Sequence, residues 1–243
     1  MSDTSPAHRA PGAALREIFL RTPYLSVKHE SYFQVYEDVL AKYVGQPVTF
    51  VEIGVFNGGS LFMWREYLGP QARIIGIDLN PDAQRWREHG FEIVIGDQAD
   101  PAFWEQFYAQ VGPVDVVLDD GGHMNQQQIV TAHMALDHIR DGGCLIVEDV
   151  HASYLPEFGN PSEHSFISFA KRVIDSMHVR FPAIASVGPP YWKKVYSMNF
   201  YESIVVFNVD SRRCFTSSWA SNDGVAAHAV DFRNMSTVKT VLY

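Results

Sequence analysis

Five short apolar segments alternate with helical patterns through the middle of the chain, and this alternation restricts the possible folds more than any other feature. The segments cover residues 48–55, 73–79, 91–96, 114–119 and 144–148, and they are rich in valine and isoleucine. Such runs are typical of strands that are buried on both faces of a sheet. Helical patterns occur between them at residues 58–68, 81–89, 101–110 and 125–139. This order predicts an α/β fold with a doubly wound parallel sheet.

The flanking segments extend this core. Helical patterns at residues 13–21 and 30–44 precede the first strand, and another is expected at 162–178. Strand-like runs at residues 195–200 and 204–209 are close enough to form a hairpin. We expect a Rossmann-like seven-stranded sheet, mostly parallel, with an antiparallel C-terminal hairpin and N-terminal helices. The predicted organisation is a flexible tail (1–12) and a single domain (13–243), divided into a helical segment (13–46), the core (47–150) and a C-terminal helix and hairpin (151–243).

Charge and composition argue against several classes of protein. The net charge is −9 and no run of lysine and arginine occurs, so a role in binding nucleic acid is disfavoured. We identify neither a signal peptide pattern nor an apolar stretch long enough to span a membrane. The two cysteines, Cys144 and Cys214, are too few for a disulfide framework. These observations predict a cytoplasmic protein.

A glycine-rich turn follows the first strand, with the sequence Glu52-Ile-Gly54-Val-Phe-Asn-Gly58-Gly-Ser60. Ligands of open α/β sheets bind at this edge. The turn is not the strict G-x-G-x-x-G of dinucleotide folds. Glu52 would repel a pyrophosphate, but not the sulfonium and ammonium groups of S-adenosylmethionine. We therefore predict that Glu52, Gly54, Gly58 and Ser60 bind this cofactor, and a tight turn without a ligand is the alternative.

Acidic residues also end the next strands. Asp78 closes the second strand, where a carboxylate accepts hydrogen bonds from ribose hydroxyls. Asp97 and Gln98 close the third strand and are candidates for binding the adenine edge, and Asp119 in the fourth strand joins the cofactor set. Any one of these acids alone can equally be a helix cap. Their repetition over successive strands favours a cofactor site.

A second group of acids is expected where the fourth and fifth strands end. The fourth strand ends in Asp119-Asp120-Gly-Gly-His123, and the fifth in Glu148-Asp149. Neighbouring parallel strands end at the same edge, so Asp120, Glu148 and Asp149 should converge. Carboxylates that are this close repel one another unless a proton or a cation intervenes. Oxygen ligands favour Mg²⁺ or Mn²⁺, and His123 is near enough to act as a catalytic base. The alternative is one capping acid with the others solvated.

These motifs resemble a known family. Residues 48–150 are similar to class I S-adenosylmethionine-dependent methyltransferases. More narrowly, Asp-Asp-Gly-Gly-His123, Glu-Asp149, Gly58-Gly-Ser-Leu-Phe-Met-Trp64 and Gly96-Asp-Gln98 resemble the metal-dependent macrolide sugar O-methyltransferases of the mycinamicin and macrocin type.

The resemblance implies Mg²⁺ on Asp120, Glu148 and Asp149, with His123 as the base. It also implies a sugar hydroxyl of a glycoside or polyketide as the methyl acceptor, and a homo-oligomer. Two departures are that Gly121-Gly122 replaces the usual glycine-serine, and that the large N-terminal region of the mycinamicin type is not part of this sequence.

Two other functions stay open at this point. A sugar oxidoreductase that uses NAD would need a phosphate-binding glycine loop and usually Tyr-x-x-x-Lys, whereas Tyr191 is followed by lysines at the second and third positions. A non-catalytic oligomerisation module would not explain the acids at five strand ends. Aromatic residues after the fifth strand, among them Tyr154 and Tyr191-Trp192, are expected either to cover the acceptor or to pack in the core.

Overall fold

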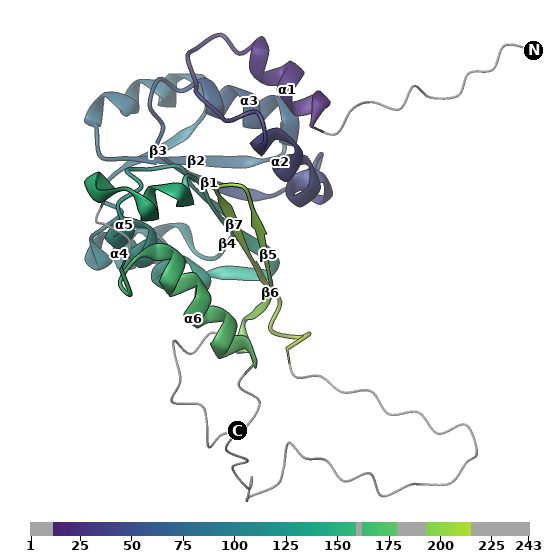
Figure 1. Cartoon of the computed structure of the whole chain (residues 1–243). Coiled ribbons are helices and arrows are strands. Elements are labelled where there is room, and N and C mark those ends of the chain that lie inside the picture. The colour runs from purple at the N-terminus through teal and green to yellow at the C-terminus, as the bar shows by residue number, and fades with distance from the viewer. Residues whose placement is uncertain (1–11, 159–161, 179–192, 215–243) are drawn as a thin grey trace, which may run out of the picture.

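A seven-stranded sheet runs through the protein, with the strand order β3-β2-β1-β4-β5-β7-β6 (Figure 1). The computed structural model describes residues 12–158, 162–178 and 193–214. The strands are β1 (Thr49–Ile53), β2 (Arg73–Asp78), β3 (Glu92–Ile95), β4 (Val114–Asp119), β5 (Ile139–Val147), β6 (Val195–Tyr201) and β7 (Ile204–Val209). β1 to β5 pair in parallel, whereas β7 pairs antiparallel with both β5 and β6. The predicted fold class is confirmed.

Helices cover both faces of the sheet and form the outer two of three layers. One face carries α1 (Ala13–Leu20), α2 (Tyr32–Leu40), η1 (Ala41–Tyr43), α3 (Gly59–Leu68) and η2 (Pro81–His89). The other face carries α4 (Pro101–Val111), α5 (Asn125–Leu136) and α6 (Phe166–His178). Successive strand residues point to opposite faces, so that Phe50 joins the first layer of core side chains and Val51 the second. This double burial explains the continuous apolar runs in the sequence.

The chain order creates a switch point in the sheet between β1 and β4. From β1 the chain proceeds outward through β2 to β3, and then returns to the opposite side of β1 to form β4. Ligands of open α/β sheets bind beyond the strand ends at such a point. Two short helices, η3 (Val150–Tyr154) and η4 (Pro156–Phe158), follow β5 at this edge.

Some element boundaries differ from the sequence predictions. α5 ends at Leu136 and β5 begins at Ile139, whereas the sequence suggested a helix to residue 139 and a strand from Cys144. The pairing of β4 with β5 shifts register between Val114 and Val116, and Gly142 has a φ of 91°. The polar start of β5 therefore belongs to an irregular strand, which an apolar pattern does not reveal.

Some predicted features cannot be assessed. The expected tail lies outside the described residues except for Gly12, and so do Tyr191 and Trp192. Over the described ranges, no helix combines the length and the apolar character needed to cross a membrane.

Candidate active site

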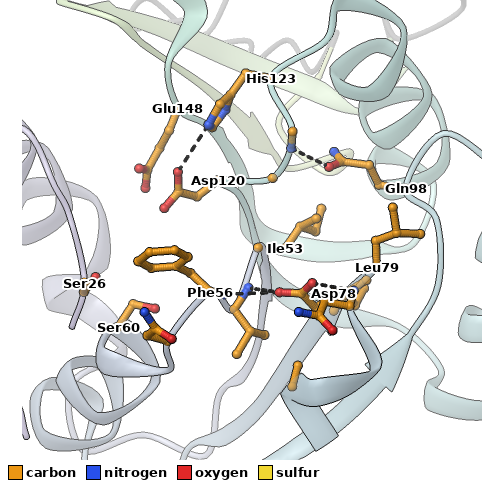
Figure 2. A pocket seen from close by; sticks show the side chains of 18 of the residues that line it. Ser26, Ile53, Phe56, Ser60, Asp78, Leu79, Gln98, Asp120, His123 and Glu148 are labelled. Atoms are coloured by element: carbon orange, nitrogen blue, oxygen red, sulfur yellow. Dashed lines mark hydrogen bonds and ion pairs between the residues drawn. The ribbon is translucent and has the colours of Figure 1, made fainter. Parts of the chain in front are cut away.

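A cavity of about 790 Å³ lies at the switch point, beyond the ends of β1, β2, β4 and β5. Residues 26–29, from the segment that joins α1 to α2, line it together with the glycine turn. Figure 2 shows Glu148, Asp120 and His123 gathered in one part of the cavity, and Asp78 in another. The volume is in the range of cavities that bind small molecules.

Asp78 fixes the glycine turn in the part of the cavity where the sequence predicts the cofactor. Its Oδ2 accepts hydrogen bonds from the backbone N–H groups of Val55 (2.8 Å) and Phe56 (3.2 Å), and its Oδ1 accepts one from Asn80 (2.8 Å). Asp78 therefore lines the cavity and also joins the end of β2 to the turn after β1.

Gly54 allows this turn to approach the end of β4. It has a φ of 90°, and a Cβ atom at this position would lie 2.0 Å from the carbonyl oxygen of Asp120. Only glycine fits such a contact at a positive φ. Gly54 and Ser60 line the cavity as predicted residues of the cofactor set, whereas Gly58, Glu52 and Asp119 lie outside its lining.

Glu52 points into the protein and supports α3. Its side chain is fully buried and accepts hydrogen bonds from Oγ of Ser60 (2.9 Å) and Nε1 of Trp64 (3.0 Å). Burial raises the pKa of Glu52 to about 7, although the charge of Lys28 opposes the shift. The structure gives Glu52 partners within the protein that hold the helix after the glycine turn.

Gln98 and Asp119 form a buried pair that links the ends of β3 and β4. Nε2 of Gln98 donates to both carboxylate oxygens of Asp119, at 2.9 and 3.1 Å. Oε1 of Gln98 accepts from the N–H of Gly122 (3.1 Å), so the amide is hydrogen bonded at both ends within the protein. Burial raises the pKa of Asp119. Asp97 lines the cavity beside this pair.

Asp120, His123 and Asp149 form a group that can hold a metal ion, because one ligand atom of each lies within 4.8 Å of the others. Nε2 of His123 lies 3.3 Å from Oδ2 of Asp149 and 4.0 Å from Oδ1 of Asp120. Each side chain is about one fifth exposed, at 21–22%. The sequence predicted that these side chains would converge, and the structure brings them together.

Lys28 lies among the same acids, and no sequence pattern indicated it. Its Nζ lies 2.5 Å from Oδ2 of Asp120, 3.0 and 3.1 Å from the two oxygens of Glu148, and 3.9 Å from Oε1 of Glu52. The Lys28 side chain is only 1% exposed. Burial lowers the pKa of Lys28, but the three acids outweigh this effect and raise it above its ordinary value.

Glu148 is therefore placed differently from Asp120 and Asp149. Besides Lys28, it accepts a hydrogen bond from the hydroxyl of Tyr36 (2.5 Å), and its side chain is 1% exposed. Burial raises the pKa of Glu148 well above its ordinary value, and the charge of Asp120 raises it further. Glu148 and Asp149 both line the cavity, but the Asp149 side chain is 21% exposed and accepts a hydrogen bond from the hydroxyl of Tyr32 (2.5 Å).

The comparison with known families identifies the core. Residues 51–150 match the family model described as a methyltransferase domain. The chain contains a methyltransferase domain. The residues that line the cavity after β1, β2, β4 and β5 all belong to this domain, whereas Lys28 precedes it.

Two relatives of this methyltransferase domain are named as O-methyltransferases. The 8-demethyl-8-α-L-rhamnosyl tetracenomycin-C 2'-O-methyltransferase of Streptomyces olivaceus is 31% identical over 186 residues, which cover 72% of this chain and 49% of that protein. The demethylmacrocin O-methyltransferase of Streptomyces fradiae is 30% identical over 183 residues, covering 70% and 46%. The chain thus spans about half the length of these curated relatives. The predicted resemblance to sugar O-methyltransferases is confirmed.

A solved structure shares the fold. MycE methyltransferase from the mycinamycin biosynthetic pathway, in complex with Mg, S-adenosylhomocysteine (SAH) and mycinamycin VI, superposes with a TM-score of 0.70 at 24% identity. The superposition covers 87% of this chain and 58% of that one. The Rossmann-like sheet with its antiparallel edge is therefore the common architecture.

Proposed function

We propose that this protein transfers a methyl group from S-adenosylmethionine to a hydroxyl of a sugar on a small natural product. One observation carries the proposal: a single cavity contains both the glycine turn with Asp78 and the group of Asp120, His123 and Asp149. A donor bound at the first and an acceptor bound at the second would meet inside it. The relative that is named for 2'-O-methylation of a rhamnosyl compound supports this choice of acceptor.

The cofactor part of the cavity fits S-adenosylmethionine. Gly54 lines the cavity, and Asp78 places a carboxylate at the end of β2, where ribose hydroxyls of nucleotide ligands bind. Five further carboxylates line the cavity, against the two cationic groups of Lys28 and Arg85; they belong to Asp82, Asp97, Asp120, Glu148 and Asp149. This excess of negative charge suits a cationic cofactor better than one with phosphate groups.

The group formed by Asp120, His123 and Asp149 fits a divalent metal. Mg²⁺ is usually held by one or two carboxylates, with water and substrate completing its coordination. Asp120 and Asp149 supply two such carboxylates at the cavity surface. We assign these two residues to Mg²⁺, or Mn²⁺, and assign His123 to proton transfer, because hard cations prefer oxygen to nitrogen ligands.

The residues of the chain would bind and orient the cofactor and the acceptor, and one of them would accept a proton. Bound Mg²⁺ would supply positive charge beside the acceptor hydroxyl, and bound S-adenosylmethionine would supply a methyl group activated by its sulfonium. Nε2 of His123 would accept the hydroxyl proton, and Asp149, 3.3 Å away, would stabilise the imidazolium. Among the described residues, Nδ1 of His123 is buried without a hydrogen-bond partner, so Nε2 is the ring nitrogen that meets the acids.

The test is a methyl-transfer assay with the acceptors for which the relatives are named. The full chain would be incubated with S-adenosylmethionine, Mg²⁺ and either rhamnosyl tetracenomycin-C or demethylmacrocin. The expected product carries one additional methyl group on a sugar oxygen, located by mass spectrometry and NMR. Transfer to the aglycone, or to neither compound, would contradict a sugar acceptor of this kind.

Calorimetry separates the other functions from this one. We expect SAH to bind and NAD⁺ not to bind. Binding of NAD⁺ alone would favour a sugar oxidoreductase, and binding of neither would favour a non-catalytic module.

Reaction in the cytoplasm is consistent with the free thiols of Cys144 and Cys214. Assembly into a homo-oligomer stays a prediction.

A further inference from the structure

Lys28 is a buried charge to which the proposed mechanism gives no role. Its ammonium contacts Asp120 at 2.5 Å and both oxygens of Glu148 at 3.0 and 3.1 Å, with 1% of the side chain exposed. A lysine is almost never this buried unless acids surround it. The acids whose convergence suggested a metal site therefore already hold one cation that belongs to the chain.

The backbone on both sides of Lys28 is held in place. Upstream, the ring of Tyr24 packs at 4.5 Å from that of Trp86. The carbonyl oxygen of Tyr24 lies so close to the start of α3 that a Cβ atom at Gly59 would be 2.2 Å from it. Downstream, α2 begins at Tyr32, whose buried side chain bonds Asp149. The segment that carries Lys28 is thus anchored to the cofactor turn at one end and to the acid group at the other.

Lys28 divides the acids into two halves. The inner half contains Glu148, Oδ2 of Asp120 and the ammonium itself. The outer half contains Oδ1 of Asp120 and the carboxylate of Asp149, which face His123 at 4.0 and 3.3 Å. Within the described part of the chain, the carboxylate of Asp149 accepts a hydrogen bond from the hydroxyl of Tyr32 and lies within 4.0 Å of the imidazole groups of His29, His123 and His151. Asp120 bridges the halves, so the ammonium and a metal would share this carboxylate.

We propose that Lys28 is a positioning residue that occupies the inner half of the acid group and so restricts a divalent metal to Asp120 and Asp149. Glu148 then holds Lys28 and not the metal. The inference rests on the proposed function, because it takes the acid group to be a metal site. It adds that the metal binds beside a resident positive charge and is held more weakly than three free carboxylates would hold it.

The sign of the effect of a Lys28 substitution tests this proposal. Full-length wild type, K28M and K28R would be titrated with Mn²⁺ alone, and free Mn²⁺ followed by electron paramagnetic resonance. Two opposite effects on the affinity for Mn²⁺ are expected when the ammonium is removed. Loss of its supporting hydrogen bond to the metal-binding carboxylate of Asp120 should lower the affinity roughly tenfold. Loss of the repulsion between the ammonium and the dication, which share this carboxylate, should raise the affinity by more than that. K28M should therefore bind Mn²⁺ at least about tenfold more tightly than wild type, while K28R should resemble wild type. A purely structural lysine predicts the opposite, because its loss would weaken the metal site.

A second measurement covers the case in which K28M folds poorly without metal. Mn²⁺ should raise the melting temperature of K28M more than that of wild type, because a tighter ligand stabilises the folded state more. In crystals of wild type with Mn²⁺, the anomalous signal should lie beside Asp120 and Asp149, with Lys28 still on Glu148. A Mn²⁺ ion coordinated by Glu148 with Lys28 displaced would overturn the proposal.

The two proposals can fail separately. If neither wild type nor K28M binds Mn²⁺, the role of Lys28 is overturned, whereas SAH binding would still support a methyltransferase. If K28M gains Mn²⁺ affinity but the chain does not bind SAH, the proposed function fails and the role of Lys28 stands.

Discussion

Nε2 of His123 lies 3.3 Å from Oδ2 of Asp149, and the backbones of both residues have positive φ angles, of 58° and 53°. Such conformations cost about 1–2 kcal/mol for residues other than glycine, and they concentrate at functional sites. Two strained residues from the ends of different strands thus meet at one point in the cavity. This geometry supports the assignment of His123 as the base.

Substitution of His123 should therefore slow methyl transfer without affecting the cofactor. H123A should lower kcat by about 10²–10⁴-fold, because a positioned base is lost, while SAH affinity stays unchanged. A histidine accepts protons only when neutral, so kcat of wild type should fall at acidic pH and H123A should lack this acidic limb. H164A is the control, because His164 is 85% exposed and lies outside the cavity lining. If the acidic limb persists unchanged in H123A, another group removes the proton.

Removal of divalent metal should stop turnover. EDTA should abolish methyl transfer by wild type, and added Mg²⁺ or Mn²⁺ should restore it, because the acceptor hydroxyl would otherwise lose the positive charge that makes it easier to deprotonate. D149N should behave like chelated wild type and should keep its affinity for SAH. The measurement is initial rate against free metal concentration. Full activity in the chelator would leave His123 as the only activating group.

Asp78 should control cofactor affinity. D78A should weaken SAH binding by tenfold or more, since a hydrogen bond to a charged group contributes about 1.5–3 kcal/mol. It should also destabilise the glycine turn, because Asp78 accepts hydrogen bonds from Val55 and Phe56. D78N keeps one acceptor oxygen and should fall between D78A and wild type in calorimetry. Wild-type affinity in D78A would remove Asp78 from the site.

The sequence was sufficient to predict the residues at strand ends, because parallel strands have a simple geometry. Apolar runs mark where β4 and β5 lie, and neighbouring parallel strands end at the same edge. The sequence therefore predicts that Asp120, Glu148 and Asp149 converge, with His123 nearby. The direction of a side chain at a strand end was less predictable. Glu52 turns toward Trp64 and Gln98 toward Asp119, because hydrogen-bond partners on the adjoining helix and strand satisfy them there.

Lys28 could not be predicted for a different physical reason. It lies in a segment without helical or strand periodicity, and it is 92 residues from Asp120 in the chain. Its position is set by the packing of α1 and α2 against the sheet and not by any local pattern. The same packing supplies Tyr36, which meets Glu148 across 112 residues. The part of the site that comes from outside the methyltransferase domain was thus the part that the sequence left unassigned.

Glu52 should make the stability of the protein depend on pH. Its pKa is raised by burial to about 7 from an ordinary value of 4.5. A carboxyl whose folded-state pKa is raised favours the folded state fully below the unfolded-state pKa, and this contribution is lost as pH rises through the folded-state pKa. The free energy of unfolding of wild type, relative to E52Q, should therefore decrease between about pH 4.5 and 7. Urea unfolding at several pH values would measure it, and a constant difference would contradict the assignment.

Phe56 has both a strained backbone conformation and an exposed aromatic ring. Substitutions can separate the effect of the strain on stability from the effect of the ring on acceptor binding. Its φ is 47° and the residue is 62% exposed. In Figure 2 the ring lies in the cavity, between the carboxylate of Asp120 and Ser60. An exposed aromatic ring at this place can pack against a sugar or polyketide acceptor. F56A and F56G both remove the ring, so both should raise KM for the acceptor while the affinity for SAH stays near wild type.

The two variants should differ in stability. Glycine relieves about 1–2 kcal/mol of left-handed strain at the expense of about 0.5–1 kcal/mol of backbone entropy, whereas alanine keeps the strain. F56G should thus unfold at a higher urea concentration than F56A. If F56A methylates the acceptor as well as wild type does, the ring has no part in acceptor binding. If the two variants are equally stable, the positive φ of Phe56 stores no strain.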